Sequence, residues 1–549
     1  MTLARSSGSG DMGREYTDEA PQPWINAGRV AGYHGLVDDA LLSPLPEPRT
    51  DKILERLAAR PDAPQRVDDP DAFLRWAAAA DDDLEGPVTL SRYLAELRSQ
   101  RPDLLDAYPQ VPGVDVVEYR EWARVFGREQ VPLDARFVPD MTTHAAPPYM
   151  QAGVNLAGFL TAELGVGELA RRLAVALRAG SIPFATTTFE RTTNRTAIAF
   201  AADTEPRFDT NLVCVNADSW GRFAQRVGPC FFTNRYTIAV WFWETSSFPS
   251  MFHSAFRGVD EIWAASSYIA DILRSVAPTG VPVREFPAPV LEPANSTRDM
   301  RALLGLPPGH PYFLTSFDHN SIAERKNPFG AIRAFREAFP QPGGPLLVVK
   351  SINGDRHPDN TARLRELIGD RDDIVVHDGY LDVADNGALI AQAAAFVSLH
   401  RAEGYGFNIV DAMALGVPVV ATAYSGNMAF TGEHCWLVPA REIAVGPGQF
   451  PYEPTALWGD PDLAAAARHL IDLAADPAAA CARAALARAH VLSSFTPERT
   501  GIFIRDRIAA VRATREEAAA RLQPAPPPPP PHPLVQRARR LRDLARSAR

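Results

Sequence analysis

One stretch of the chain combines residue types that could do chemistry on a phosphorylated ligand. It runs from His400 to Ala414 with the sequence HRAEGYGFNIVDAMA, directly after the apolar run AAFVSL, and its second half has a helical pattern. Gly404 and Gly406 allow the backbone to approach a ligand closely. The backbone amides of residues 405–409 are expected to point outward at a helix start, where an anion can bind.

Two carboxylates flank this glycine turn. Glu403 lies just before it, and Asp411 lies eight positions later, on the expected helix. The first carboxylate is placed to reach sugar hydroxyls, and the second to accept hydrogen bonds from ribose hydroxyls. A phosphate cradle between two such groups suits a nucleotide-sugar, although the glycines alone would also serve a tight strand-to-helix turn.

Strands that alternate with helices must position this stretch. Apolar, Val/Ile-rich segments predict buried strands at Val154–Phe159, Leu212–Asn216, Thr237–Phe242, Glu261–Ala265, Tyr312–Phe317, Leu346–Ser351, Ile374–His377, Ala395–His400, Val417–Thr422 and Cys435–Val438. Such alternation indicates parallel sheets. The break near Pro287–Pro293 divides the strands into two series, so we expect an α/β protein with two Rossmann-like, doubly wound domains. The ligand should lie at the carboxyl ends of the strands, in a cleft between the domains.

The remaining segments complete the expected organisation. We predict a disordered leader over 1–50, a helical accessory domain over 51–131, a first Rossmann-like domain over 149–290 and a second over 291–496. A helix over 497–520 should cross back to the first domain, with Thr496 as its N-cap and Pro497 at its first position. A polyproline spacer and a basic tail fill 521–549.

Composition excludes several classes of protein. The 549 residues are 46% hydrophobic and 22% charged, which is typical of a globular protein, and the net charge of −10 argues against a nucleic-acid partner. No apolar run has the length of a membrane span, and the four cysteines have neither metal nor disulfide spacing. We therefore expect a cytoplasmic protein. The arginines and apolar stripe of 534–549 fit either a solubilising end or an amphipathic helix that contacts a partner or the inner face of a membrane.

Several spaced segments together resemble glycosyltransferase family 4. The stretch around Glu403 is similar to the E-x7-E segment of that family, and VPVVATAYSGN (417–427) is similar to its next strand and loop. SFDHNSIAERKNPFGAIRAFREAF (316–339) resembles its other donor segment. Three segments in the first half of the resembling region are also similar to that family: NLAGFLTAELGVGELARRLAVAL (155–177), WFWETSSFPSMF (241–252) and VDEIWAASSYIADIL (259–273). The resemblance covers roughly 150–515 and implies the GT-B fold, with the acceptor on the first domain and the nucleotide-sugar donor on the second.

The resemblance also implies roles for individual residues. Glu403 would touch the donor sugar, while Lys326 and Arg325 would neutralise charge that develops on the leaving diphosphate. The donor-binding set would comprise Gly404, Tyr405, Gly406, Phe407, Asn408, Asp411, Gly165 and Gly167. Glu244, within WFWET, would have an acceptor-side role, or else cap a strand end. Transfer would retain the anomeric configuration, with no metal and no cofactor besides the donor substrate.

Three positions depart from the family pattern. The second acid of the motif is Asp411, one methylene shorter than glutamate. Asn320 lies near the place of a basic residue that usually precedes the lysine, and Phe286 to Pro289 replace a segment that often carries a histidine. A catalytically silent glycosyltransferase-like scaffold that recruits partners therefore remains the alternative, and a sugar-nucleotide epimerase is a third hypothesis.

Overall fold

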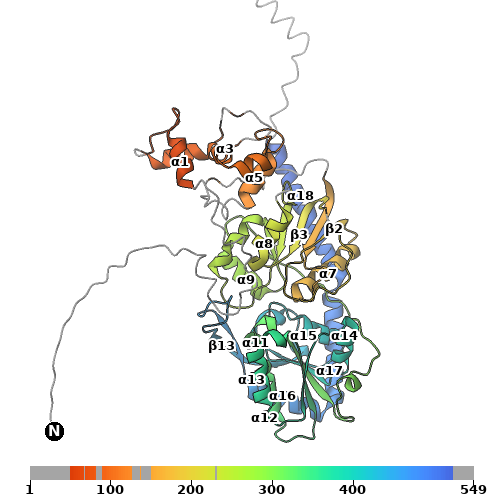
Figure 1. Cartoon of the computed structure of the whole chain (residues 1–549). Helices are drawn as coiled ribbons and strands as arrows, with labels where there is room; N and C mark the ends of the chain where they lie inside the picture. Colours follow the sequence, from red (N-terminus) through yellow and green to blue (C-terminus); the bar gives the residue numbers. More distant parts are fainter. Residues whose placement is uncertain are drawn as a thin grey trace, which may run out of the picture.

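The computed structural model describes residues 50–66, 69–81, 84, 90–125, 137, 150–203, 205–228 and 231–522. The expected leader except Thr50, the Pro-rich stretch 132–148 except Phe137, and the spacer and tail after residue 522 lie outside the described residues. Short helices come first: α1 (Thr50–Ala58), α2 (Pro70–Ala78), α3 (Arg92–Ser99), α4 (Pro102–Ala107) and α5 (Val116–Val125). Figure 1 shows this group at one end of the molecule, against the domain that follows it. Arg124 of α5 donates to the carbonyl of Arg257 there (3.0 Å).

The first sheet has six parallel strands in the order β2-β1-β3-β4-β5-β6. The strands are β1 (Gln151–Gly158), β2 (Phe184–Thr188), β3 (Phe208–Cys214), β4 (Tyr236–Val240), β5 (Glu261–Ala264) and β6 (Val283–Glu285). The helices between them are α7 (Gly165–Ala179), α8 (Ala217–Val227), the 3-10 segment η5 (Ser250–Gly258) and α9 (Ser267–Val276). All seven residues of β3 are buried, as expected for a strand covered by helices on both faces.

The second sheet also has six parallel strands, in the order β12-β11-β10-β7-β8-β9. They are β7 (Tyr312–Asp318), β8 (Leu346–Ile352), β9 (Ile374–Asp378), β10 (Ala395–Ser398), β11 (Val419–Thr422) and β12 (Trp436–Val438). The helices are α10 (Met300–Leu303), α11 (Ala323–Lys326), α12 (Pro328–Ala338), α13 (Pro358–Ile368), α14 (Val383–Ala391), α15 (Phe407–Ala414), α16 (Leu463–Ala475) and α17 (Pro477–Ser494). Short 3-10 segments are η6 (His319–Ser321), η7 (Gly354–Arg356), η8 (Ser425–Ala429) and η9 (Gly432–His434). The predicted class of two Rossmann-like parallel-sheet domains is confirmed.

All ten predicted strands are present, and four further strands in the described part of the chain escaped prediction. Among the missed strands, β2 is rich in threonine and has two buried residues, and β6 has three residues of which one is buried. The other two, β13 (Ala440–Ala444) and β14 (Leu457–Pro461), pair antiparallel in a hairpin. Because β13 carries charged, mostly exposed residues, it lacks the apolar signal of a buried strand.

The strand order reverses once in each sheet, between β1 and β3 and between β7 and β10. In such sheets ligands bind beyond the carboxyl ends of the strands at the point of reversal. Contacts between the domains come from these ends. For example, Asn194, which follows β2, donates to Asp318 at the end of β7 (2.9 Å). We call this region the domain junction.

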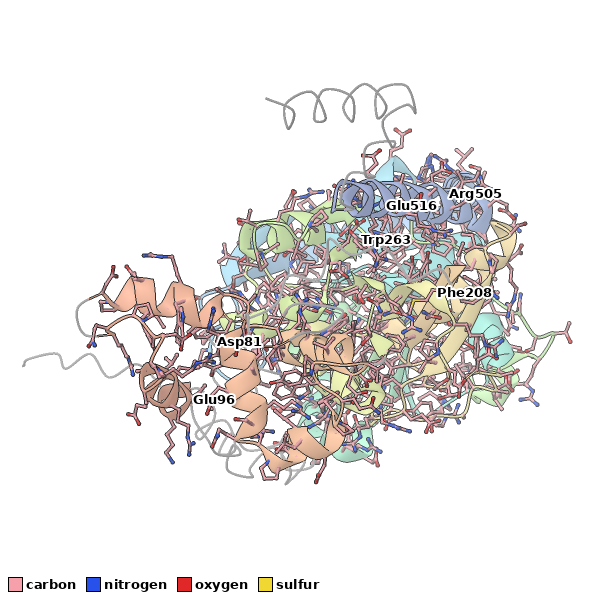
Figure 2. The ribbon with its side chains drawn as sticks, turned by 90° about the horizontal axis from the view of Figure 1, so that it is seen from above. Asp81, Glu96, Phe208, Trp263, Arg505 and Glu516 are labelled. Carbon is pink, nitrogen blue, oxygen red and sulfur yellow. The ribbon has the colours of Figure 1, made fainter. Side chains whose placement is uncertain are left out.

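The last described helix, α18 (Pro497–Leu522), packs on the first domain. Thr496 caps it by accepting from the amide of Arg499 (3.2 Å), as the sequence predicts. Figure 1 shows α18 running behind α7 and β3, and Figure 2 shows Trp263 beneath it. The rings of Trp263 and Phe503 lie 5.0 Å apart, and Arg507 binds the buried Glu261 through Nε (2.9 Å). This helix therefore fastens the second half of the chain to the first sheet.

Candidate active site

An acidic residue and two basic residues meet at the reversal point of the second sheet. Glu403 follows β10, and Arg325 and Lys326 end α11, which follows β7. The Nζ atom of Lys326 donates to Oε1 of Glu403 (2.6 Å), and Arg325 lies 3.4 Å from Oε2. Arg325 also donates to the carbonyl of Ala402 (3.0 Å). The three residues predicted as catalytic therefore form one cluster.

Backbone geometry and hydrogen bonds hold this cluster in place. Asn327 adopts a left-handed conformation and caps α12. It also donates to the carbonyl of Leu399 (2.8 Å), which joins the segment after α11 to the segment after β10. The amide of Glu403 donates to the Ser425 hydroxyl (2.8 Å), and its carbonyl accepts from Gly426 (2.9 Å). A side chain at 426 would overlap the carbonyl of Gly404, so only glycine allows this approach.

The cluster keeps Glu403 ionised. Burial raises the pKa of this carboxyl, but the charges of Lys326 and Arg325 outweigh burial and lower the pKa from 4.5 to about 2. The side chains of Glu403 and Lys326 are 10% and 21% exposed. Solvent therefore reaches the pair only in part, and its electrostatic interactions are screened less than those of a surface pair.

The glycine turn leads directly into α15. Gly406 has φ 97°, in the left-handed region that favours glycine, and no side chain in the described part of the chain caps the helix there. The amide of Ile409 donates to the Gly406 carbonyl (3.0 Å), so the expected set of outward amides ends at Asn408. The helix begins two residues earlier than its apolar pattern indicates. The first turn of α15 has no cap from the described side chains, so its amides are of the kind that can bind an anion.

The side chains of this turn have different surroundings. Tyr405 is 2% exposed and packs against Phe407 and Phe430 in the core, whereas Asn408 is exposed. Tyr405 can therefore serve a ligand through its backbone, and Asn408 through backbone and side chain.

Gly165 and Gly167 lie in the first turn of α7, not in a loop before it. A Cβ on Gly165 would lie 3.6 Å from the ring of Phe407, which places the start of α7 beside the start of α15. A Cβ on Gly167 would overlap the carbonyl of Phe159, so Gly167 allows α7 to pack closely on the end of β1. Two helix starts without side-chain caps thus meet at the domain junction.

Asp411 forms an ion pair that the sequence does not suggest. Its Oδ1 accepts from a terminal nitrogen of Arg172 in α7 (2.6 Å), and Nε of Arg172 binds Glu168 (2.7 Å). Burial raises the pKa of Asp411 although Arg172 opposes the change. Because Oδ1 is occupied by Arg172, the ribose contact expected of Asp411 would have to use Oδ2. Sequence analysis did not single out Arg172. A signal was present, because Arg172 is a charged residue on the apolar face of α7, between Leu169 and Leu173.

Glu244 joins the same charged cluster from the first domain. Its Oε2 accepts from the Tyr452 hydroxyl (2.8 Å), and its Oε1 lies 3.9 Å from Arg325. Tyr452 belongs to the loop between β13 and β14, and its ring meets that of Trp243 (5.3 Å between centroids). The hairpin thus brings the second domain onto the loop that follows β4. Sequence analysis missed Tyr452 because the hairpin itself was not predicted.

The arrangement offers positive charge and amide dipoles at one edge of the second sheet. Among the residues that the structure describes, no three His, Cys, Asp or Glu side chains are grouped so as to hold a metal ion. None of the described helices is both long and apolar enough to cross a membrane. The groups present can bind an anion and stabilise negative charge that develops on it.

Comparisons with known proteins point to the same region. Residues 326–445 match the family model described as glycosyl transferases group 1, a segment that begins at Lys326 and includes Glu403 and the glycine turn. No curated protein matches the chain. Together with two Rossmann-like domains that meet at their carboxyl edges, the family match supports a glycosyltransferase of the GT-B type.

Solved structures with a similar arrangement include sucrose-phosphate synthase from Thermosynechococcus elongatus. It is 17% identical, with a TM-score of 0.48, over 66% of this chain and 100% of that one. HepE of Anabaena in complex with UDP is 14% identical (TM-score 0.46; 65% and 100% covered). A glycosyltransferase from Rickettsia africae is 13% identical (TM-score 0.46; 66% and 98% covered).

Proposed function

We propose that this chain is a retaining glycosyltransferase that moves a sugar from a nucleoside-diphosphate sugar to an acceptor hydroxyl. The observation that carries the proposal is the cluster of Lys326, Arg325 and Glu403 beside the uncapped start of α15. Cations and backbone amides at one point suit a diphosphate leaving group, because they stabilise the negative charge that grows as the glycosidic bond breaks.

Each residue has a role in this proposal. The amides of residues 404–408 hold the diphosphate, and Lys326 with Arg325 neutralises its charge. Glu403, fixed as a carboxylate, accepts hydrogen bonds from hydroxyls of the donor sugar. Asp411 accepts from ribose through its second oxygen. Gly165 faces the start of α15, and Gly167 supports it by letting α7 pack on the end of β1.

The first domain would supply the acceptor side, with Glu244 as its residue nearest to the cluster. The reaction would need no metal, because Lys326 and Arg325 provide the positive charge that a metal otherwise supplies. We place the enzyme in the cytoplasm, with a hexosyl donor and a role in glycan, polysaccharide or glycolipid assembly. The basic tail would provide any contact with a membrane or a partner.

The experiment uses the full chain and a panel of UDP-, GDP- and ADP-sugars. At least one sugar nucleotide should raise the unfolding temperature and should release its nucleoside diphosphate slowly with water as acceptor. Glu403→Gln and Lys326→Met should lower that release about 100-fold or more, the usual cost of removing one transition-state contact. Arg441→Gln is the control, because Arg441 is 80% exposed.

Failure of every donor to bind would overturn the proposal and favour the catalytically silent scaffold. Conversion of one sugar nucleotide to another, without transfer, would favour the epimerase.

A further inference from the structure

Arg172 is a buried cation with an unused donor at the domain junction. The residue is 3% exposed, and its Nη1 atom has no hydrogen-bond partner among the described residues. A guanidinium nitrogen that is buried without a partner costs about 1–3 kcal/mol or more, so native proteins rarely keep one without a reason.

The rest of the guanidinium is held firmly. Its Nε binds Glu168 one turn earlier on α7 (2.7 Å), and Nη2 binds Asp411 of the second domain (2.6 Å). Its carbon atom lies 4.8 Å from the centre of the Phe407 ring. Because the guanidinium is planar, these contacts also fix the direction of both N–H groups on Nη1.

Phe407 is the first residue of α15, so Arg172 lies against the helix start proposed to hold the diphosphate. An arginine fork that is already oriented loses little freedom when it binds a phosphate oxygen. Lys326 and Arg325 of the second domain bind Glu403, the residue before the glycine turn that leads into Phe407, whereas Arg172 belongs to the first domain.

We propose that Arg172 is a further ligand of the donor diphosphate, binding a phosphate oxygen through Nη1 while Glu168 and Asp411 hold the guanidinium in place. This inference rests on the proposed function. It gives the first domain a direct part in donor binding. One ligand would then contact both domains, and donor binding would stabilise their association.

The competing explanation is that Arg172 only ties the two domains together through Asp411. The variants Arg172→Met and Arg172→Lys distinguish this explanation from a role in phosphate binding. Lysine keeps a positive charge, but its donors are on one freely rotating nitrogen. It therefore cannot bind two carboxylates and a phosphate in fixed directions as a planar guanidinium can. Asp411→Asn breaks the same ion pair but keeps the guanidinium, which is then held by Glu168 alone. Arg178→Met is a control on the exposed side of the same helix.

The measurement is the affinity of each variant for UDP and for uridine, by calorimetry and by ligand-observed NMR titration. GDP with guanosine, or ADP with adenosine, replaces this pair if the wild type prefers that base. We expect Arg172→Met and Arg172→Lys to weaken UDP binding about 10- to 100-fold, as for the loss of one charge-assisted hydrogen bond. Uridine binding should stay within twofold, and Arg178→Met should match the wild type for both ligands.

Asp411→Asn keeps the guanidinium, which Glu168 still binds, so it should weaken UDP binding relative to uridine binding less than Arg172→Met does; an equal loss in both variants would favour the domain tie. The inference is overturned if the Arg172 variants keep wild-type affinity for UDP, or if they weaken UDP and uridine equally. Absence of nucleoside-diphosphate binding by the wild type would instead overturn the proposed function on which the inference rests.

Discussion

Replacing Lys326 by methionine should expose how strongly the charged cluster depends on this one cation. Glu403 would lose the partner that lies 2.6 Å from its Oε1 and would keep only Arg325 nearby. Removing the partner of a buried carboxylate strongly destabilises the folded state, because the carboxylate charge stays in a poorly solvated place. Lys326→Met should therefore destabilise the second domain even without any ligand.

The magnitude follows from the pKa of Glu403. Lowering this pKa from 4.5 to about 2 corresponds to about 3 kcal/mol in favour of the ionised form. Lys326 supplies the largest favourable part and Arg325 the next, so the coupling between Lys326 and Glu403 should be on the order of 2 kcal/mol.

The pH dependence has a definite sign. Because the pKa of Glu403 is lower in the folded chain than in the unfolded chain, its ionisation stabilises the fold above about pH 4.5. This stabilisation is lost as the pH falls from 4.5 toward 2. Without Lys326 the pKa of Glu403 rises, so the acid-unfolding midpoint of Lys326→Met should lie at a higher pH than that of the wild type.

The assay is a double-mutant cycle of Lys326→Met and Glu403→Gln, with urea unfolding followed by circular dichroism and tryptophan fluorescence. Burial lowers the pKa of Lys326, so the coupling should be measured near neutral pH and should not grow as the pH rises further. A coupling below about 0.5 kcal/mol, or an unchanged acid-unfolding midpoint in Lys326→Met, would refute the reasoning.

Two further substitutions test the glycine turn and the returning helix. Gly406→Ala should cost about 1–3 kcal/mol, because φ is 97° there, and should also weaken nucleotide binding. Gly305→Ala, at a left-handed position in open space, should cost a similar amount and leave binding unchanged; equal binding by both variants would contradict the assignment of the turn. Glu261→Gln should lower the free energy of unfolding by about 3 kcal/mol, because it breaks a buried ion pair with Arg507. Arg505→Gln on the same helix should stay within about 0.5 kcal/mol, and an equal loss in both variants would contradict the anchoring role of Glu261.

The fold was predictable because strands such as β8 and β10 are short apolar runs bounded by turn residues. The stretch around Glu403 was recognisable for a similar reason, since its glycines, carboxylates and helix start are adjacent in the chain. Lys326 could be grouped with it only through the family resemblance. Local sequence does not show that β7 and β10 are neighbours in the sheet.

The contacts across the domain junction were beyond sequence reasoning. Arg172 and Asp411 are 239 positions apart, and nothing in either local sequence indicates the other. Tyr452 reaches Glu244 from a hairpin whose first strand, β13, is charged and mostly exposed and carries little periodic signal. Burial of polar groups at such a junction depends on how two domains approach, which is a property of the whole fold.

A crystal structure of the full chain with a bound nucleoside diphosphate tests the central claim most directly. The account predicts density for the diphosphate against the amides of residues 404–408, with a phosphate oxygen within hydrogen-bond distance of Lys326. A nucleotide bound elsewhere on the molecule, with the pair of Lys326 and Glu403 untouched, would contradict it.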